Sequence, residues 1–249
     1  MVFKNYAKYY DLLYKDKDYP KEADYIFSLL TKYKIEFGDI LELGCGTGKH
    51  ASLLSEYGYN IHGIDFSEDM LERARFLARN NSKLFFEKGD VRTFEVDKIF
   101  DAVLSLFHVV SYQVTNQHLK ATFNTVNKHL KKGGFFIFDC WYGPAVLSEK
   151  PERRIKELEN EEICVSRIAE PVMYPQKNCV DVNYTVAIED KITNETDVLK
   201  ETHKMRYLFD TEIELLLNDI GIEVIASEEW ITGKVPSFET WGVCFICKK

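Results

Sequence analysis

The chain shows two different patterns of apolar and polar positions, and the pattern changes after Trp141. Before it, short apolar runs alternate with stretches in which apolar residues recur every three or four positions. The short runs predict strands and the longer period predicts helices. Alternating strands and helices of these lengths predict βαβ units, and so an α/β fold with a doubly wound, mostly parallel sheet. The predicted strands span 39–43, 60–66, 83–91, 100–109 and 135–141, and the predicted helices 19–33, 47–57, 68–80 and 116–130.

After Trp141 the pattern is a strict alternation. Val180, Val182, Tyr184 and Val186 fall on one face of a run whose intervening residues are mostly polar. Such alternation predicts half-buried strands of an antiparallel sheet. Similar runs at 163–170 and 199–209 complete a predicted meander. Strands are expected again at 222–230 and 240–247, after a helix at 212–220.

Two local patterns in this second half carry predictions of their own. Thr211 and Glu214 have the spacing of a capping box, which would begin the helix at 212–220. The charged stretch at 149–162, "EKPERRIKELENEE", contains more acids than bases. Its charge pattern favours a solvated helix or loop.

Charge and hydropathy narrow the function classes. The net charge of −8 argues against a nucleic-acid partner, because neutralising phosphates requires a surplus of Lys and Arg. No apolar run reaches the roughly 18 residues of a membrane span, so no membrane association is expected. The first 18 residues lack the pattern of a signal peptide. We therefore expect a cytoplasmic protein with reduced thiols.

The cysteines raise one question, because Cys244 and Cys247 form a C-x-x-C pair. A redox or zinc role would fit that spacing, but no second Cys/His pair with finger-like spacing is present. The pair lies in a predicted strand, where the two side chains would point to opposite faces. We interpret them as packing residues and expect no metal site.

The stretch "LELGCGTGKH" places Gly44, Gly46 and Gly48 between a predicted strand and helix. Glycine there lets a ligand approach the main chain without meeting a Cβ, and the helix N-terminus favours an anionic group. A phosphate loop would require Ser or Thr after Lys49, and a dinucleotide loop would require a third glycine at position 49. The G-x-G-x-G spacing instead suits a ligand with a carboxylate and no pyrophosphate.

Acidic residues end the next two strands. Asp65 follows the loop at a distance that suits an acceptor for both ribose hydroxyls. Asp90 ends the third strand, where its carboxylate can meet an adenine amino group while Met70 covers a ring face. The loop and the two acids together are far more specific than the loop alone.

These motifs, from "LELGCGTGKH" through "GIDFSEDML" and "GDVRTF" to "HLKKGGFFIFD", resemble the class I S-adenosylmethionine-dependent methyltransferases across roughly residues 38–140. The resemblance implies a Rossmann-like, seven-stranded sheet with an antiparallel last strand, and S-adenosyl-L-methionine as cofactor. The cofactor-binding residues it implies are Tyr6, Gly44, Cys45, Gly46, Asp65, Phe66, Met70, Asp90, Val91 and Leu106.

A narrower similarity concerns both ends of the chain. "YAKYYDLLYKDKDYPKEADYI", the antiparallel insert and "HKMRYLFDTEIELLL" are similar to bacterial sugar-nucleotide N,N-dimethyltransferases of the desosamine and mycaminose type. The similarity implies a small-molecule acceptor and a homodimer. The expected organisation is an N-terminal helical lid at 1–37, a cofactor-binding core at 38–145, an acceptor-side β insert at 146–209, and a closing helix and strands at 210–249.

Candidate acceptor-side residues come from three segments. Tyr14 belongs to the predicted lid and His108 follows the fourth strand, where an imidazole is a reasonable general base. His203 and Arg206 lie on opposite faces of an insert strand, and one of them would face a substrate phosphate. Each of these residues also fits an ordinary packing or surface role. The function alternatives are methylation of an aminosugar nitrogen, O-methylation of a sugar or other small metabolite, and a non-catalytic module that only binds the cofactor.

Overall fold

The computed structural model describes residues 12–15 and 17–249, so the predicted cofactor contact Tyr6 lies outside the described residues. The chain divides into two compact units. The core unit comprises Asp18–Glu149 and Tyr207–Lys249. The sheet unit comprises the described residues before Asp18 together with Lys150–Arg206. Of the segment 1–37 that is expected to form a lid, the described residues from Asp18 onward belong to the core unit.

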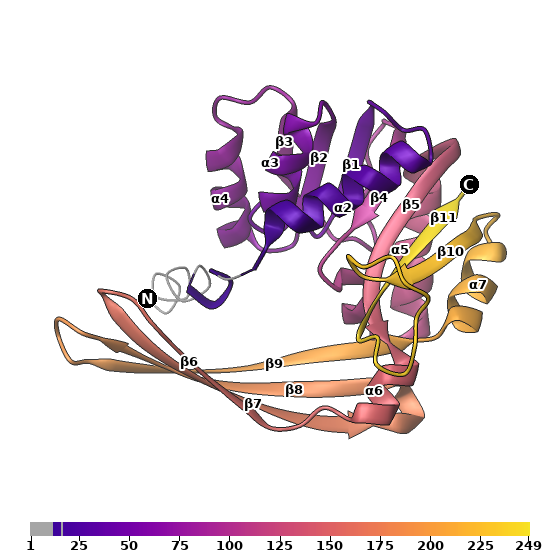
Figure 1. The fold of residues 1–249 in the computed structure, drawn as a ribbon. Helices are drawn as coiled ribbons and strands as arrows, with labels where there is room; N and C mark the ends of the chain where they lie inside the picture. Colours follow the sequence, from indigo (N-terminus) through magenta and orange to yellow (C-terminus); the bar gives the residue numbers. More distant parts are fainter. Residues whose placement is uncertain (1–11, 16) are drawn as a thin grey trace. The chain divides into compact units, whose positions relative to one another are not determined.

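The core unit alternates strands and helices in its first half, as the hydrophobic pattern predicts (Figure 1). Its strands are β1 (Asp39–Leu43), β2 (Asn60–Asp65), β3 (Leu84–Lys88), β4 (Phe100–Ser105), β5 (Leu130–Tyr142), β10 (Glu223–Glu229) and β11 (Gly242–Lys248). Its helices are α2 (Tyr19–Lys32), α3 (Lys49–Glu56), α4 (Glu68–Ala78), the 3-10 turn η1 (Val109–Tyr112), α5 (Asn116–His129), α6 (Gly143–Glu149) and α7 (Asp210–Asn218).

Strand order in the core unit is that of a doubly wound sheet. The first five strands run parallel in the order β3-β2-β1-β4-β5, and β11 pairs antiparallel with β5. The antiparallel last strand is thus observed. The expected count of seven strands is not confirmed, because Tyr207 and Leu208 of β9 also pair with Trp141 and Tyr142 of β5 within the core unit.

Helices cover both faces of the core sheet. On one face, Ile40, Leu104 and Ile137 pack against apolar residues of α2, α3 and α4. On the other face, Leu41 and Phe136 pack against α5 and α7. This two-sided burial explains why the parallel strands read as nearly continuous apolar runs. It also leaves the carboxyl ends of β1 to β4 free to carry polar groups.

The sheet unit is an antiparallel meander of long strands. Its strands are β6 (Arg154–Glu159), β7 (Ile163–Tyr174), β8 (Cys179–Asp190) and most of β9 (Thr196–Leu208). Val186 and Ile188 of β8 lie on one face with Val165 of β7, and Leu12 and Leu13 of the N-terminal segment complete this apolar cluster. The observed register pairs every residue of β7 with β8, so the alternation in the sequence was a reliable guide.

Two expectations for the second half are wrong. The charged stretch contains β6, whose residues pair with Cys164–Ala169 of β7, and is not a helix or loop throughout. Exposed charges on a short edge strand are common because they oppose pairing with other chains. Thr211 and Glu214 form no capping box, because α7 begins at Asp210, two residues before the expected start at 212. The Asp210 carboxylate accepts hydrogen bonds from the Tyr142 and Ser227 hydroxyls.

The C-x-x-C pair is part of the hydrophobic core. Cys244 and Cys247 are fully buried on opposite faces of β11, each within a different apolar cluster. Within residues 12–15 and 17–249, no group of His, Cys, Asp and Glu side chains is arranged to hold a metal ion. Over the same residues, every helix is too short or too polar to cross a membrane.

Candidate functional site

The glycine loop joins β1 to α3. The backbone N–H groups of Gly44 and Cys45 both donate to the Ile64 carbonyl, so the loop is fastened to the end of β2. Gly44 has φ +76°, and a Cβ there would approach Val109 Cγ2 to 2.6 Å. At Gly46, with φ +54°, a Cβ would meet no atom within 4 Å. Glycine is therefore needed at position 44 for packing, whereas at position 46 it keeps a space open beside the main chain.

Asp65 is held in place by two backbone donors. Its Oδ2 accepts from the Gly46 N–H at 2.9 Å, and its Oδ1 accepts from the Ser67 N–H at 2.8 Å. Ser67 in turn caps α4 through a hydrogen bond from the Met70 N–H. The carboxylate is thereby fixed beside the glycine loop, with lone pairs left for a ligand.

Glu42 lies beneath this loop with 1% of its surface exposed. Its Oε2 has no hydrogen-bond partner among the described residues. Burial, and then the nearby charge of Asp65, raise the pKa of Glu42 to about 8. A buried carboxyl group without a partner is costly, and a ligand bearing positive charge would offset that cost. This buried carboxyl group thus fits a cofactor that carries a sulfonium and an ammonium group.

A cleft of about 460 Å³ opens at the carboxyl ends of the strands. Its volume lies in the range of small-molecule sites. The residues lining it are Gly44, Asp65, Phe66, Gly89, Asp90, Val91, Arg92, Val109, Tyr112, Gln113 and His118. Five of the predicted cofactor residues are therefore brought together here, from the carboxyl ends of β1, β2 and β3: Gly44, Asp65, Phe66, Asp90 and Val91.

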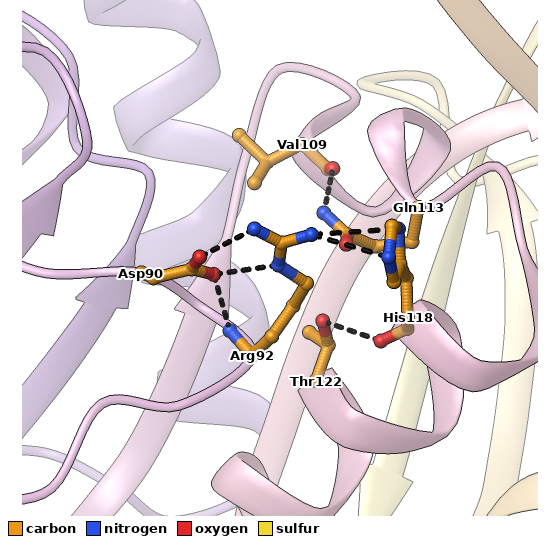
Figure 2. A network of polar contacts seen from close by, with 6 residues as sticks. All are labelled: Asp90, Arg92, Val109, Gln113, His118 and Thr122. Carbon is orange, nitrogen blue, oxygen red and sulfur yellow. Dashed lines mark hydrogen bonds and ion pairs between the residues drawn. The ribbon is translucent and has the colours of Figure 1, made fainter.

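Arg92 and His118 were not predicted as site residues. Figure 2 shows the Arg92 guanidinium between the Asp90 carboxylate and the His118 ring. The hydrogen bonds from the Arg92 side chain lower the pKa of Asp90, against a smaller opposing effect of burial. The sequence places Arg92 only two residues after Asp90, which was a usable signal, whereas nothing in the sequence connects either residue to His118.

His108 lies directly after β4 and has a carboxylate partner. Its Nδ1 is 2.7 Å from Oδ2 of Asp139, a β5 residue that is 1% exposed. This is an ion-pair distance without hydrogen-bond alignment, while the His108 backbone N–H donates to both Asp139 oxygens. Phe107 and His108 both have positive φ, at +66° and +62°. Two such residues in a row carry backbone strain of the kind found at functional sites.

Four of the predicted cofactor residues that the structure describes, Gly46 among them, do not line the cleft. Cys45 and Leu106 are buried in the hydrophobic core. Met70 lies in the first turn of α4, where its N–H donates to the Ser67 cap. Their predicted contacts with a cofactor stay predictions.

The remaining candidates belong to the sheet unit. Tyr14 packs on the apolar cluster of that unit, and burial raises the pKa of its hydroxyl despite the nearby charge of Arg167. His203 pairs across the strands with Val182 and stacks edge-on with Tyr184, 5.1 Å between ring centres. Arg206 pairs with Cys179 on the opposite face and is 5% exposed. The two are thus on opposite faces, as the alternation predicts.

Comparison with known proteins identifies the family of this chain. Residues 40–134 match the model of the methyltransferase domain family. The chain is 28% identical to a dTDP-3-amino-3,4,6-trideoxy-alpha-D-glucopyranose N,N-dimethyltransferase of Streptomyces venezuelae, covering 88% of this chain and 91% of that one. A dTDP-3-amino-3,6-dideoxy-alpha-D-glucopyranose N,N-dimethyltransferase of Streptomyces fradiae is 25% identical, covering 88% and 84%. This chain is a class I S-adenosylmethionine-dependent methyltransferase.

The fold of the methyltransferase agrees with that assignment. The crystal structure of an S-adenosylmethionine-dependent methyltransferase from Clostridium acetobutylicum superimposes with a TM-score of 0.82 at 23% identity, over 100% of this chain and 99% of the other. The match to the methyltransferase domain family and the named methyltransferase relatives support an enzyme that uses S-adenosylmethionine, and they do not support the alternative of a non-catalytic binding module.

Proposed function

We propose that this methyltransferase acts on the amino group of a nucleotide-linked aminosugar. The observation that carries the proposal is similarity over nearly the whole chain, sheet unit included, to two enzymes named for that reaction. A match limited to the core unit would support only the use of the cofactor. Since 88% of the chain is covered, more than the core unit alone, the similarity extends into the sheet unit and supports an acceptor of the same chemical class.

The cofactor residues have distinct proposed roles. Gly44 and Gly46 keep the main chain accessible to the methionine part. Glu42 beneath them loses its proton when the positively charged methionine part binds, and its carboxylate then offsets that charge. Asp65, fixed by the Gly46 and Ser67 N–H groups, accepts from the ribose hydroxyls. Asp90 accepts from the adenine amino group. When bound, the cofactor supplies an activated methyl group attached to a sulfonium sulfur.

His108 is the proposed general base. An amino acceptor must lose a proton around methylation, and an imidazole within reach of the nitrogen can accept it. Asp139 Oδ2 lies 2.7 Å from Nδ1 of His108, so the carboxylate is beside that edge of the ring and Nε2 is the nitrogen left to face the acceptor. The carboxylate also stabilises the imidazolium that forms, because the charge pair lies at the border of the hydrophobic interior.

Tyr14, His203 and Arg206 are the proposed acceptor-side residues. Tyr14 would orient the amine through its hydroxyl, and the buried position of that group keeps it protonated and able to donate. His203 contacts Glu201 at 3.0 Å, so an acidic partner already orients its ring toward one face of the sheet. We also propose that the protein works as a homodimer, which its mass in solution will test.

One observation favours a second candidate, O-methylation of a sugar or other small metabolite. A hydroxyl group requires a real base, and general bases contribute about 10² to 10⁴-fold. The contact of His108 with buried Asp139 is the arrangement that such a base requires. The two candidates differ in the acceptor atom, and therefore in the acceptors that the enzyme will turn over.

The first experiment is calorimetric titration with S-adenosylmethionine and its demethylated product, on wild type and on Asp65→Ala. We expect wild type to bind with micromolar affinity. Asp65→Ala should weaken binding at least about 10-fold, because it removes one charged hydrogen-bond acceptor. A panel of dTDP-aminosugars and the matching hydroxyl sugars then follows, with products identified by mass. Turnover of the amino compounds alone supports the proposal, and turnover of the hydroxyl compounds alone replaces it with the second candidate.

A further inference from the structure

Asp90 is held by one neighbouring residue at three points. The Arg92 backbone N–H donates to Oδ1 at 2.9 Å, and the Arg92 Nε donates to the same oxygen at 2.8 Å. A third bond runs from Nη2 to Oδ2. The guanidinium thus grips both carboxylate oxygens side by side, a geometry that lysine does not reproduce. The pair is only partly exposed, at 23% for the Asp90 side chain and 35% for Arg92.

The other side of the guanidinium is also occupied. Arg92 Nη1 lies 3.3 Å from Nε2 and 3.5 Å from Nδ1 of His118. Nearly equal distances to both nitrogens mean that the group contacts the ring between them instead of making one in-plane hydrogen bond. His118 is itself fixed in the first turn of α5, where its N–H donates to the Thr115 cap and its carbonyl accepts from Thr122. Arg92 therefore has fixed contacts on two sides (Figure 2).

We propose that Arg92 is a positioning residue that makes the Asp90 carboxylate selective for a base with an amino group at its hydrogen-bonding edge. The proposal rests on the proposed contact between Asp90 and the adenine amino group. Arg92 keeps Asp90 ionised and fixes the plane of its carboxylate at the cleft, where the remaining lone pairs of the two oxygens can only accept hydrogen bonds. His118 holds the guanidinium so that it cannot leave Asp90 and donate to the ligand instead.

The chemical consequence is rejection of a deaminated cofactor. Adenine presents an N–H donor at position 6, whereas hypoxanthine presents a carbonyl oxygen there. An ionised carboxylate has no proton to give, so hypoxanthine would place two acceptors against each other. A site built to accept a hydrogen bond discriminates strongly against an analogue that lacks the donor. Without Arg92, Asp90 is free to rotate away or to take up a proton, and the rejection weakens.

The test compares two ligands on matched variants by calorimetry: S-adenosylhomocysteine and S-inosylhomocysteine. Wild type should bind the adenosyl compound about 30-fold more tightly, the size expected for one charged hydrogen bond in a partly exposed site. Arg92→Gln should reduce this ratio to about 3-fold or less, and Arg92→Lys should restore it only in part. Arg153→Gln, which removes an exposed arginine paired with Glu170 in the sheet unit, should leave the ratio unchanged. Melting curves confirm that each variant is folded.

Asp90→Asn tests the underlying contact separately. Its amide can donate to a hypoxanthine oxygen, so the ratio should fall below that of Arg92→Gln and move toward the inosyl compound. An Arg92→Gln variant that keeps the wild-type ratio, or that binds the adenosyl compound more tightly than wild type, would overturn the proposal. The second result would mean that Arg92 competes with the base. None of these binding measurements involves a methyl acceptor. If no aminosugar of the panel is methylated but the affinity ratios change as expected, the proposed acceptor is rejected and the proposed role of Arg92 stands.

Discussion

His108 and Asp139 are 31 positions apart in the sequence, yet His108 Nδ1 lies 2.7 Å from Asp139 Oδ2. Parallel pairing of β4 with β5 matches Ser105 with Phe138, which brings the ends of the two strands together. If His108 is the base, His108→Gln should lower kcat about 100-fold. Cofactor affinity should stay within about 2-fold of wild type, a change smaller than the loss of one hydrogen bond. Wild-type kcat in this variant would rule out the base.

Asp139→Asn should have a smaller effect in the same direction. The amide still accepts from the His108 backbone N–H, but it no longer stabilises a charged imidazole ring. We expect kcat to fall about 10-fold, about 1.4 kcal/mol of barrier, with KM for the acceptor nearly unchanged. Steady-state kinetics of His108→Gln, Asp139→Asn and the double variant check this. If the two residues act as one unit, the double variant should be no slower than His108→Gln alone.

Gly46→Ala should separate folding from cofactor binding. The added Cβ meets no protein atom within 4 Å, so its cost in stability is that of the positive φ, about 1 kcal/mol. It does occupy the space beside the main chain, and cofactor affinity should fall at least 10-fold, about 1.4 kcal/mol. Gly58→Ala is the matched control, since Gly58 also has a positive φ and no neighbour within 4 Å. Equal cofactor affinity in the two variants would contradict the proposed approach of the ligand to Gly46.

The raised pKa of Glu42 predicts how the stability of the ligand-free enzyme depends on pH. Its pKa rises from 4.5 to about 8 on folding, so the folded state holds a proton that the unfolded state has released. The stabilising contribution is fully present below pH 4.5 and is lost as the pH rises to about 8. Glu42→Gln keeps the uncharged shape, so its melting temperature should exceed that of wild type at pH 8.5 and match it more closely at pH 5. Parallel pH profiles for the two proteins would show that Glu42 is ionised throughout.

The cofactor half of the site was predictable because it follows from local pattern. Gly44, Asp65 and Asp90 each end a parallel strand, and parallel strands bring such ends to one edge of the sheet. Arg92 with His118, and His108 with Asp139, were not predictable as pairs. Their contacts depend on how a side chain crosses to the next βα connection, which neither periodicity nor spacing encodes. The charged strand β6 was missed because its polarity hides the alternation that a half-buried strand shows.

The reactivity of the native cysteines can report local unfolding of the protein. Cys164 is half-buried, whereas Cys45, Cys140, Cys179, Cys244 and Cys247 are buried. Burial raises the pKa of the Cys140 and Cys247 thiols well above the usual value, so the reactive thiolate is scarce while the fold is intact. A thiol reagent should therefore modify Cys164 first and each remaining cysteine only when its surroundings unfold. The order and rate of labelling, followed by mass spectrometry without any engineered probe, would then map the local unfolding free energies of both units.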